Sequence, residues 1–384
     1  MKRGDKQNQE RDQNIVDDYR ICFRDLRVTN SIIRRELLSR VEEVLSTGPI
    51  LMGPRVVEFE DQMAQYCGRR SAVGVSSGTC ALYLALRACG VGPGDEVLTT
   101  PMSWLATLNA IVMSGATPVF VDVQEDQNIN PSKLVDAITQ RTRAIVPVHF
   151  TGRLCDMATI AEIARVSNLL VIEDAAQAMG AECPEYRAGS IGDAGAFSLN
   201  PMKVFPGFGE AGAVVTDNPE VEAKLRSLRY LGTENKEVCV DISLNHKMDE
   251  IQAALLLDGF DLIGNLVEAR VTMARRYSEK LREIVGCPPV PPVGDCASNF
   301  FDYVIFVKDR EGLRNYLYAQ GIETKIKHPV LLCDHPAYPC NPRPQIPVAD
   351  RLVREMISLP LHEKMDTTDI DYVCDSIYQY FHGE

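Results

Sequence analysis

The chain has 384 residues, of which 45% are hydrophobic and 24% are charged, and its formal net charge is −13 at pH 7. These values are typical of a globular protein that is long enough for one large domain and one smaller domain. The acidic excess argues against binding to nucleic acid or to an anionic membrane surface. No apolar run approaches the roughly 18 residues that span a bilayer.

The N-terminal part of the chain changes from polar to helical. Residues 1–19 are polar and charged without an apolar period, and we expect a disordered leader there. From Asn30 to Leu45 the apolar residues recur at helical spacing, and a second helix is predicted over Val56–Cys67. The twelve cysteines show no Cys-x-x-Cys spacing and no signal peptide precedes them, so we expect free thiols in a reducing cytoplasm.

Short apolar strands alternate with amphipathic helices through the central part of the chain. The predicted strands are Ala72–Val75, Glu96–Thr100, Pro118–Asp122, Ala144–His149, Leu169–Glu173, Ala194–Leu199 and Ala211–Thr216. Helices are expected at Thr79–Cys89, Leu105–Ser114, Lys133–Ile138 and Ile160–Ser167. Strands that are apolar throughout and separated by helices predict an α/β fold with a mostly parallel sheet covered on both faces.

The pattern changes again after about residue 243. A long helical stretch, Met248–Ile284, precedes a proline-rich break at Cys287–Pro292. A small α+β unit is expected beyond it, with strand Phe301–Val307, helix Glu311–Ala319, strand Glu323–Ile326 and a terminal helix after Thr368. We therefore predict a leader (1–19), a large α/β domain (20–247) and a small C-terminal domain (248–384) that includes the long connecting helix.

Small residues lie where the first predicted strand passes into a helix. Ser77, Gly78 and Thr79 allow a ligand to approach the backbone, and the free amides at a helix start suit a phosphate. Simple N-capping by Ser77 or Thr79 explains the same segment equally well. Neither a Walker loop nor a Gly-x-Gly-x-x-Gly turn occurs, so ATP and nicotinamide chemistry lack their usual sequence support.

Two acids, Glu173 and Asp174, stand at the carboxyl end of an apolar strand, where α/β sheets bind ligands. A carboxylate there can cap a helix, bind a metal or pair with a cationic ring nitrogen. The six histidines form no convincing ligand spacing, and the group around His328, Cys333, His335 and Cys340 is a weak zinc candidate, so we predict no metal.

A lysine, Lys203, lies in the turn between two apolar strands, in Phe197-Ser198-Leu199-Asn200-Pro201-Met202-Lys203. A lysine on a connecting loop is usually a surface residue, but an amine in a desolvated pocket has a lowered pKa and can form a Schiff base. Trp104, the only tryptophan, follows another strand and can stack on a planar ligand. A phosphate cradle, a strand-end acid, a strand-end lysine and an aromatic plate together predict a pyridoxal 5′-phosphate site.

With these motifs the chain, from about Ile15 to about Ile377, resembles the DegT/StrS-type sugar aminotransferases, which are fold-type I pyridoxal-phosphate enzymes with an aspartate-aminotransferase-like fold. The resemblance rests on Ser77-Gly78-Thr79, on Pro101-Met102-Ser103-Trp104-Leu105-Ala106-Thr107, on Glu173-Asp174-Ala175-Ala176-Gln177, on Ser198-x-x-x-x-Lys203 with Gly209-Glu210, and on Ser243-Leu244-Asn245-His246-Lys247-Met248.

The resemblance implies a role for each matched residue. Lys203 would be the Schiff-base lysine and Asp174 the partner of the pyridine nitrogen, with Gln177 near a cofactor oxygen. It implies that Ser77, Gly78, Thr79 and Ser198 bind the phosphate, and that Trp104 stacks on the cofactor ring. Asn245 would reach the cofactor of the other subunit, which implies a homodimer with shared active sites. Arg229, Lys247, Lys325, Lys327 and His328 are candidates for substrate contacts, although solvated loop charges explain the basic ones equally well.

The activity implied is transfer of an amino group from L-glutamate to a keto group of a nucleotide-activated (dTDP, UDP or GDP) deoxyhexose. Such a reaction would serve a surface polysaccharide or a secondary-metabolite amino sugar. Dehydration of the sugar and amination of a cyclitol remain alternatives, although the dehydratase branch has histidine in place of the lysine. A non-catalytic ligand-binding protein on the same fold is the alternative from a different class.

Overall fold

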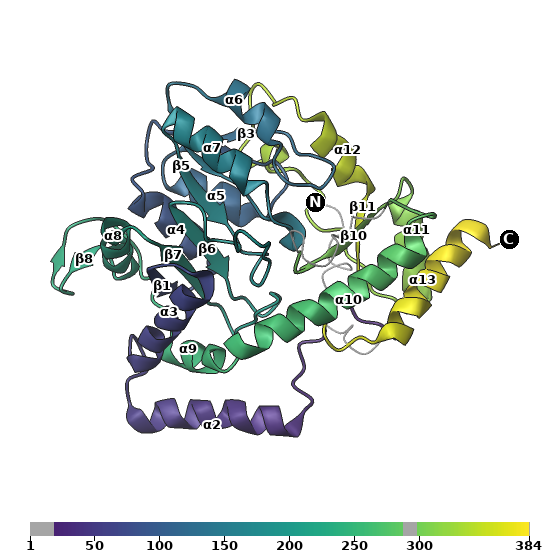
Figure 1. Cartoon of the computed structure of the whole chain (residues 1–384), viewed down its shortest axis with the longest axis horizontal. Coiled ribbons are helices and arrows are strands. Elements are labelled where there is room, and N and C mark those ends of the chain that lie inside the picture. Colours follow the sequence, from purple (N-terminus) through teal and green to yellow (C-terminus); the bar gives the residue numbers. More distant parts are fainter. Residues whose placement is uncertain (1–18, 287–297, 384) are drawn as a thin grey trace, which may run out of the picture.

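The computed structural model describes residues 19–286 and 298–383, and its centre is a seven-stranded sheet (Figure 1). The predicted leader, apart from Tyr19, and the proline-rich break lie outside the described residues. The strands are β1 (Ser71–Val75), β2 (Glu96–Thr99), β3 (Thr117–Phe120), β4 (Thr142–Val146), β5 (Leu170–Asp174), β6 (Ala194–Ser198) and β7 (Gly212–Thr216). All seven predicted strands are confirmed within one or two residues at most ends, the largest difference being the earlier end of β4.

The sheet has the order β1-β7-β6-β5-β4-β2-β3. The pairs β2–β3, β2–β4, β4–β5 and β5–β6 are parallel, whereas β7 runs antiparallel to both β1 and β6. The mostly parallel sheet is therefore confirmed. Its parallel strands end at one edge, and the loops that follow β5 and β6 emerge there side by side because Asp174 pairs with Ala196.

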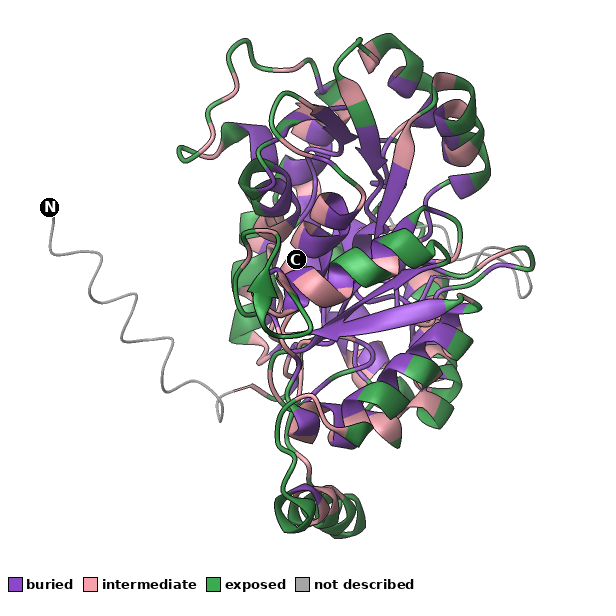
Figure 2. Cartoon of the chain, turned by 90° about the vertical axis from the view of Figure 1, so that its left-hand side faces the viewer, coloured by how far each residue is buried: buried purple, intermediate pink, exposed green. Residues whose placement is uncertain are grey.

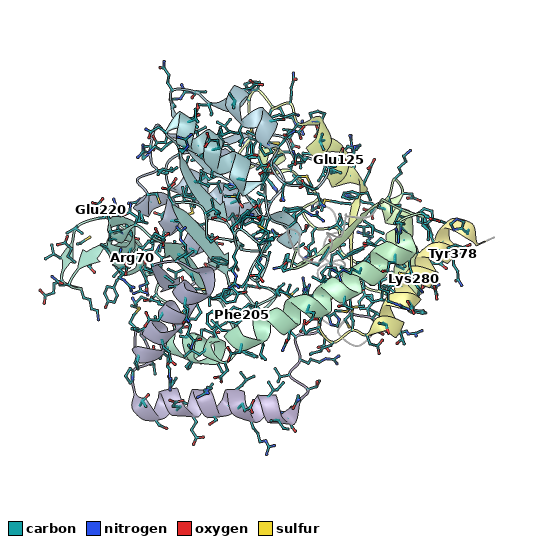
Figure 3. The ribbon with its side chains drawn as sticks, in the orientation of Figure 1. Arg70, Glu125, Phe205, Glu220, Lys280 and Tyr378 are labelled. Carbon is teal, nitrogen blue, oxygen red and sulfur yellow. The ribbon has the colours of Figure 1, made fainter. Side chains whose placement is uncertain are left out.

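Helices cover both faces of the sheet, because successive strand residues point to opposite sides. Ala196 belongs to the core formed with α4 (Gly78–Ala88), α5 (Leu105–Met113) and α8 (Pro219–Arg229). Its neighbour Phe197 belongs to the core formed with α3 (Pro54–Cys67) and α9 (Glu250–Leu257), and α7 (Met157–Ser167) packs on strands β2, β4 and β5. Figure 3 shows Phe205 inside the molecule and Glu125, Glu220 and Lys280 at its periphery.

A second core lies in the C-terminal part of the chain. Strands β10 (Tyr303–Phe306) and β11 (Met356–Leu359) pair antiparallel and pack with α10 (Ile263–Leu281), α11 (Arg310–Ala319) and α13 (Thr367–His382). Helix α12 (Pro347–Glu355) packs between β10 and the large sheet unit. The domain boundary that we predict after residue 247 stays a prediction.

The remaining elements are short, apart from α2 (Ser31–Thr47). They are the 3₁₀ turns η1 (Pro131–Lys133), η2 (Phe150–Gly152), η3 (Phe260–Leu262) and η4 (Leu332–Asp334), helix α6 (Leu134–Ala137), and the hairpin β8 (Thr233–Glu234) and β9 (Val238–Cys239). Asn30 caps α2, and its side chain accepts hydrogen bonds from the amides of Ile32 and Ile33. Helix α2 stands apart from the body and is largely exposed (Figures 1 and 2), with Val44 its one buried residue.

Two of the predicted elements are corrected. The long helix Met248–Ile284 is divided into α9 and α10 by η3, and Gly259 lies at the break, where a Cβ would lie 2.6 Å from Cε2 of Phe205. The predicted strand Glu323–Ile326 makes only an isolated bridge from Lys325 to Ser358 of β11. Helices α8 and α12 and strand β11 were not predicted, although Asn218 as N-cap with Pro219 at the first position of α8 is a typical helix start.

The ten cysteines in the described part of the chain are free thiols, as predicted. None of the helices within residues 19–286 and 298–383 combines the length and the apolar character that a membrane crossing requires.

Candidate active site

A cavity of about 610 Å³ lies where β1, β5 and β6 end, and residues 325–329 of the C-terminal part close its other side. Lys203, Asp174 and Ser77 all line it, although the sequence separates them widely. Residues 325–329 follow the bridge that ties Lys325 to β11. The chain thus brings the strand-end motifs of one core and a basic loop of the other to one cavity.

Lys203 lies in the loop after β6, where its amide donates to the carbonyl of Asn200 at 2.9 Å. Its Nζ lies 4.6 Å from the centroid of the Phe301 ring, and within the described residues it forms no ion pair. Burial lowers the pKa of Lys203 to about 8; Asp174 raises it and the charge of Lys327 lowers it further. About one tenth of this amine is therefore unprotonated at pH 7, against fewer than about one in a thousand for a lysine with the ordinary pKa of 10.5. A nucleophile or proton carrier requires this unprotonated form.

The two acids at the end of β5 have different surroundings. Glu173 is fully buried and accepts hydrogen bonds from His149 at 2.9 Å and from the amides of Gly189, Ile191 and Gly192 at 2.7–2.8 Å. Glu173 does not line the cavity, and its hydrogen bonds fix the loop that contains Gly189 and Gly192. Asp174 lines the cavity, so the structure singles it out from the predicted pair.

Asp174 is 5% exposed and accepts hydrogen bonds from Thr107 Oγ1 at 2.7 Å and from the amide of Ala176 at 3.2 Å. Burial raises its pKa, while the bond from Thr107 and the charge of Lys203 act in the opposite direction. A carboxylate in such a place gains from a cationic partner. Thr107 is in turn bonded to Ser103 at 2.7 Å, so the orientation of the acid is fixed from α5.

The predicted phosphate cradle lies between β1 and α4. Ser77, Gly78, Thr79 and Ser198 line the cavity, and the first turn of α4 offers amides without intrahelical acceptors. A Cβ at Gly78 would lie 2.4 Å from the Cβ of Ser198, so only glycine fits there. The cradle therefore consists of backbone amides and hydroxyls, as a phosphate dianion requires.

The aromatic and amide candidates also line the cavity. Trp104 is 60% exposed at the cavity rim, and its ring centroid lies 5.6 Å from that of His328. Burial lowers the pKa of His328 to about 4, so this imidazole is neutral near pH 7. Gln177 accepts a hydrogen bond from the amide of Thr151 at 2.9 Å, which orients its side chain at the cavity wall.

Of the predicted substrate residues, Lys325, Lys327 and His328 line the cavity. Lys327 Nζ lies 2.6 and 2.8 Å from the two carboxylate oxygens of Asp302, and Lys325 lies 2.6 Å from Glu323. The two lysines are the basic groups of the C-terminal loop that face the same space as Lys203.

Arg229 corrects a prediction. It is 4% exposed, its guanidinium binds Glu60 and donates to the carbonyl of Gly74 at 2.9 Å, and it does not line the cavity. Asn245 is exposed outside the cavity, and Lys247 Nζ lies 4.2 Å from the centroid of the Tyr230 ring. These two residues reach no site within this single chain.

Sequence reasoning did not identify Phe301, Asp302 or Phe23, although Phe301 and Phe23 line the cavity beside Lys203 and Lys327. No local motif marks them, because they meet the lysines through long-range contacts. The role of Thr107 had a signal, since it ends the segment Pro101–Thr107 that carries Trp104.

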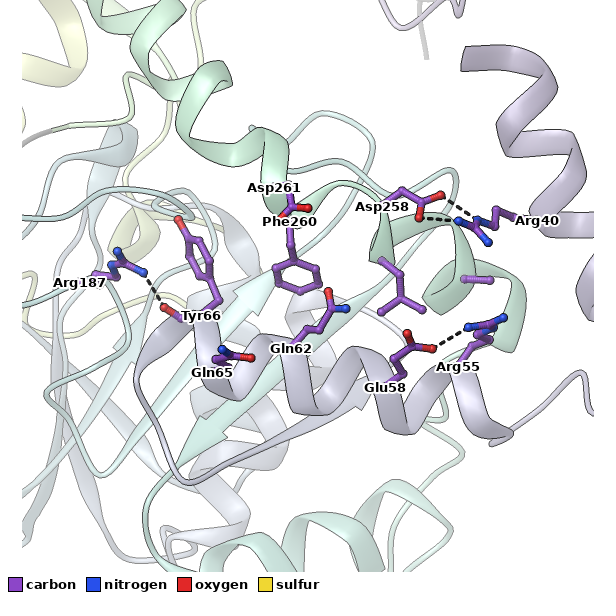
Figure 4. A pocket seen from close by; sticks show the side chains of 12 residues that line it. Arg40, Arg55, Glu58, Gln62, Gln65, Tyr66, Arg187, Asp258, Phe260 and Asp261 are labelled. Carbon is purple, nitrogen blue, oxygen red and sulfur yellow. Dashed lines mark hydrogen bonds and ion pairs between the residues drawn. The ribbon is translucent and has the colours of Figure 1, made fainter. Parts of the chain in front are cut away.

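A second cavity, of about 670 Å³, lies between α2, α3 and α9 (Figure 4). Its basic residues are engaged: Arg40 binds Asp258 through two bonds of 2.8 Å, Arg55 binds Glu58, and Arg187 donates to the carbonyl of Tyr66. No group of three or more potential ligands in residues 19–286 and 298–383 is arranged to hold a metal ion.

The residues of the Lys203 cavity fit pyridoxal 5′-phosphate. The donor set contains an amine of lowered pKa, a buried acid, a glycine-limited cradle of hydroxyls and amides, and an aromatic ring at the rim. These are the groups that the cofactor's aldehyde, ring nitrogen, phosphate and ring face require.

Comparison with known proteins adds independent findings. The model of the DegT/DnrJ/EryC1/StrS aminotransferase family matches residues 31–378. The chain is 36% identical to dTDP-3-amino-3,4,6-trideoxy-alpha-D-glucose transaminase of Streptomyces venezuelae, over 94% of this chain and 96% of that protein. It is 31% identical to UDP-2-acetamido-2-deoxy-3-oxo-D-glucuronate aminotransferase of Pseudomonas aeruginosa, over 93% and 99%. The crystal structure of NtdA from Bacillus subtilis with bound cofactor PMP superimposes with a TM-score of 0.87 and 30% identity, covering 94% of this chain and 85% of that one.

Proposed function

The chain belongs to the DegT/DnrJ/EryC1/StrS aminotransferase family and is an aminotransferase that uses pyridoxal 5′-phosphate. We propose that it moves an amino group from L-glutamate to a keto group of a nucleotide-activated deoxyhexose. The observation that carries the proposal is the amine of Lys203, desolvated and without an ion pair in the described chain, in the same cavity as the buried acid Asp174. Relatives that act on dTDP- and UDP-linked sugars support the substrate class.

The cofactor, when bound, supplies the electron sink for a carbanion next to nitrogen. In the proposed reaction Lys203 anchors it and, once released, takes a proton at Nζ and returns it as general base and acid. A pKa of about 8 suits this role, because both protonation states of the amine are populated at the working pH. Asp174 would meet the ring nitrogen and keep it protonated, and Thr107 fixes the orientation of this carboxylate.

We assign the phosphate to Ser77, Gly78, Thr79 and Ser198, and the ring face to Trp104. Gln177, which lines the cavity, would contact a cofactor oxygen. Lys325 and Lys327 meet the diphosphate of the sugar nucleotide at the cavity mouth, and neutral His328 can donate one hydrogen bond to the sugar. The same basic groups can receive the carboxylates of the amino donor in the first half of the reaction.

A second copy of the chain completes the site in this proposal. Helix α2 exposes Ile32, Leu38 and Leu45 at 58%, 62% and 64%, and the loop that carries Asn245 exposes Leu244 at 62%. An apolar surface of this kind on a helix that stands away from the body is typical of a subunit interface. Asn245 would act across it, and the ten free thiols support a reducing cytoplasm as the compartment.

An absorption spectrum with and without excess L-glutamate tests the first half of the reaction. The expected result is a yellow cofactor band that bleaches to the pyridoxamine form, followed by recovery when the matching keto sugar nucleotide is added. A panel of dTDP-, UDP- and GDP-linked keto sugars with product analysis identifies the acceptor. Loss of water from the sugar would indicate a dehydratase, and acceptance of a cyclitol ketone alone would exclude the sugar substrate.

Mixing two inactive variants tests the shared site. Lys203→Ala and Asn245→Ala subunits, unfolded and reassembled together, should recover about one quarter of native activity, because half of the dimers are mixed and each mixed dimer holds one intact site. No recovery, with each variant shown to be dimeric, would contradict the role of Asn245 across the interface.

A further inference from the structure

A thiol and an imidazole lie together behind the cradle, outside the proposed reaction. Cys80 stands in the first turn of α4, and its Sγ lies 3.1 Å from Nδ1 of His246 and 3.3 Å from Oγ of Ser76. His246 is 6% exposed, and its Nε2 has no hydrogen-bond partner within the described residues. Neither residue lines the Lys203 cavity, whereas the preceding residues Ser77, Gly78 and Thr79 do.

The surroundings of Cys80 favour a thiolate. A nucleophile within hydrogen-bond distance of a base is the arrangement that activates cysteines in enzymes, and the start of a helix stabilises the negative charge. Burial alone raises the pKa of the Cys80 thiol, but the bonds from His246, Ser76 and Ser77 outweigh it and lower the pKa to about 7. Cys22 differs, since burial raises the pKa of its thiol, and the imidazole beside it, His362, contacts the Cys22 backbone carbonyl at 3.2 Å.

Cys80 is also joined to the cradle. Its amide donates to Ser77 Oγ at 3.2 Å, so the hydroxyl that we assign to the phosphate also caps the turn that carries the thiol. The turn has little freedom to shift, because Gly78 is already packed against Ser198. A group added to Cys80 Sγ would disrupt the contacts of this sulfur with His246 and Ser76, and it would act on the cradle through the Ser77 hydroxyl that caps the same turn.

We propose that Cys80 and His246 form a modification site for disulfides of low molecular weight, and that a mixed disulfide at Cys80 weakens binding of the cofactor phosphate. The effect on phosphate binding rests on the proposed cradle. The proton of the thiol passes to Nδ1 of His246, and the thiolate attacks one sulfur of the disulfide. The S–S bond breaks, a new bond to Cys80 Sγ forms, and the other sulfur leaves as a thiolate. The disulfide is the only oxidant required.

The test incubates the purified holoenzyme at pH 7 with glutathione disulfide and follows each cysteine by mass spectrometry. Cys80 should react about fivefold faster than Cys22, since its larger thiolate fraction is partly offset by the lower nucleophilicity of a less basic thiolate. His246→Gln, which keeps size and polarity but not basicity, should lower the rate at Cys80 to that of Cys22 without changing Cys22. Equal rates at Cys80 and Cys22 in the wild-type protein would overturn the proposal that Cys80 and His246 form a reactive pair, whether or not the variant folds. If a second subunit buries Cys80, the thiol will not react with the disulfide, and this result would also overturn the proposal.

The second measurement titrates pyridoxal phosphate into apoprotein with and without the mixed disulfide. Modified protein should bind about tenfold more weakly, the effect expected for the loss of one charge-assisted hydrogen bond, and reduction should restore the affinity. Cys80→Ser protein treated in the same way should show no change. Unchanged affinity after complete modification would overturn the link to the cradle. Failure of the unmodified protein to bleach with any amino donor would instead refute the proposed function and leave the thiol rates measurable.

Discussion

The Lys203 cavity and the cavity between α2, α3 and α9 have similar volumes, about 610 and 670 Å³. Both contain cations paired with carboxylates, such as Lys327 with Asp302 in the first cavity, and they differ in Lys203. Arg40 and Arg55 in the second cavity are paired with carboxylates and remain partly exposed. Lys203 has an aromatic ring at 4.6 Å and no ion pair in the part of the chain that the structure describes. A desolvated cation without a counter-ion has a perturbed pKa, and this property, rather than size or the number of basic groups, distinguishes the reactive cavity.

The comparison predicts the largest effect for the unpaired amine. Lys203→Ala should lower transamination of L-glutamate at least about 10⁴-fold, because it removes both the anchor and the proton carrier. Cofactor bound without covalent attachment can still be detected by equilibrium dialysis. Activity within tenfold of the native value would show that another group carries the proton.

Asp174→Asn should lower the rate about 100-fold, the loss of one electrostatic partner of the reacting centre. The cofactor should remain bound, so the rate measured by glutamate-induced bleaching falls while the cofactor content does not. Thr107→Val is the matched milder change, because it removes a hydrogen bond to the same carboxylate at 2.7 Å and keeps the charge. An equal loss in both variants would mean that orientation matters more than charge.

The pH dependence of cofactor uptake tests whether the pKa of Lys203 is lowered. With a Lys203 pKa of about 8, uptake by apoprotein should fall about fivefold from pH 8 to pH 7 and level off above pH 9, whereas uptake through a lysine of pKa 10.5 would still rise about eightfold from pH 9 to pH 10. Uptake should rise with pH because only the unprotonated amine of Lys203 can react with the cofactor aldehyde. Lys327→Met should move the midpoint upward, since Lys327 lowers the Lys203 pKa. A midpoint near 10 in native protein would contradict the desolvated site.

The paired cavity should give the smallest effect. Arg187→Ala removes a surface ion pair with Glu182 and a bond to the carbonyl of Tyr66, and should lower the free energy of unfolding by less than about 1 kcal/mol. Transamination should be unchanged. Denaturant unfolding and the bleaching assay measure the two quantities, and a large loss of activity would show that the second cavity communicates with the first.

Local sequence signals predicted the sheet and most of the site, because each apolar strand ends in its own motif. The local motif did not separate the two acids of β5, and only the family resemblance assigned the role to Asp174. The physical difference is that Asp174 lines the cavity, whereas Glu173 accepts hydrogen bonds from the amides of Gly189 and Gly192. The surroundings of residues that depend on long-range contacts could not be predicted from the sequence either. Arg229 looked like a free basic group, but its partner Glu60 is 169 residues away.

The C-terminal part of the site was predicted only in part, for the same reason: Lys325, Lys327 and His328 were candidates and line the cavity, whereas Phe301 and Asp302 were not identified. Lys327 and His328 were recognised only as basic candidates, because Asp302, Phe301 and Trp104, which define their surroundings, lie in other segments. The break in the long helix lies at Gly259, beside Phe205 of a distant segment, and no local pattern shows this contact.

The segment after Tyr19 joins the C-terminal core. Ile21 donates to the carbonyl of Gly321 at 3.0 Å, and the amide of Phe23 donates to Glu323, 300 residues further along the chain. At about 5–20 residues per second, a ribosome needs roughly 15–60 s to add that length. Ile21 and Phe23 are 4% and 3% exposed in the complete fold. During synthesis their side chains therefore stay exposed until the C-terminal residues that bury them have been added. This places the nascent chain within reach of chaperones that bind such segments, and makes this segment one of the last parts to dock.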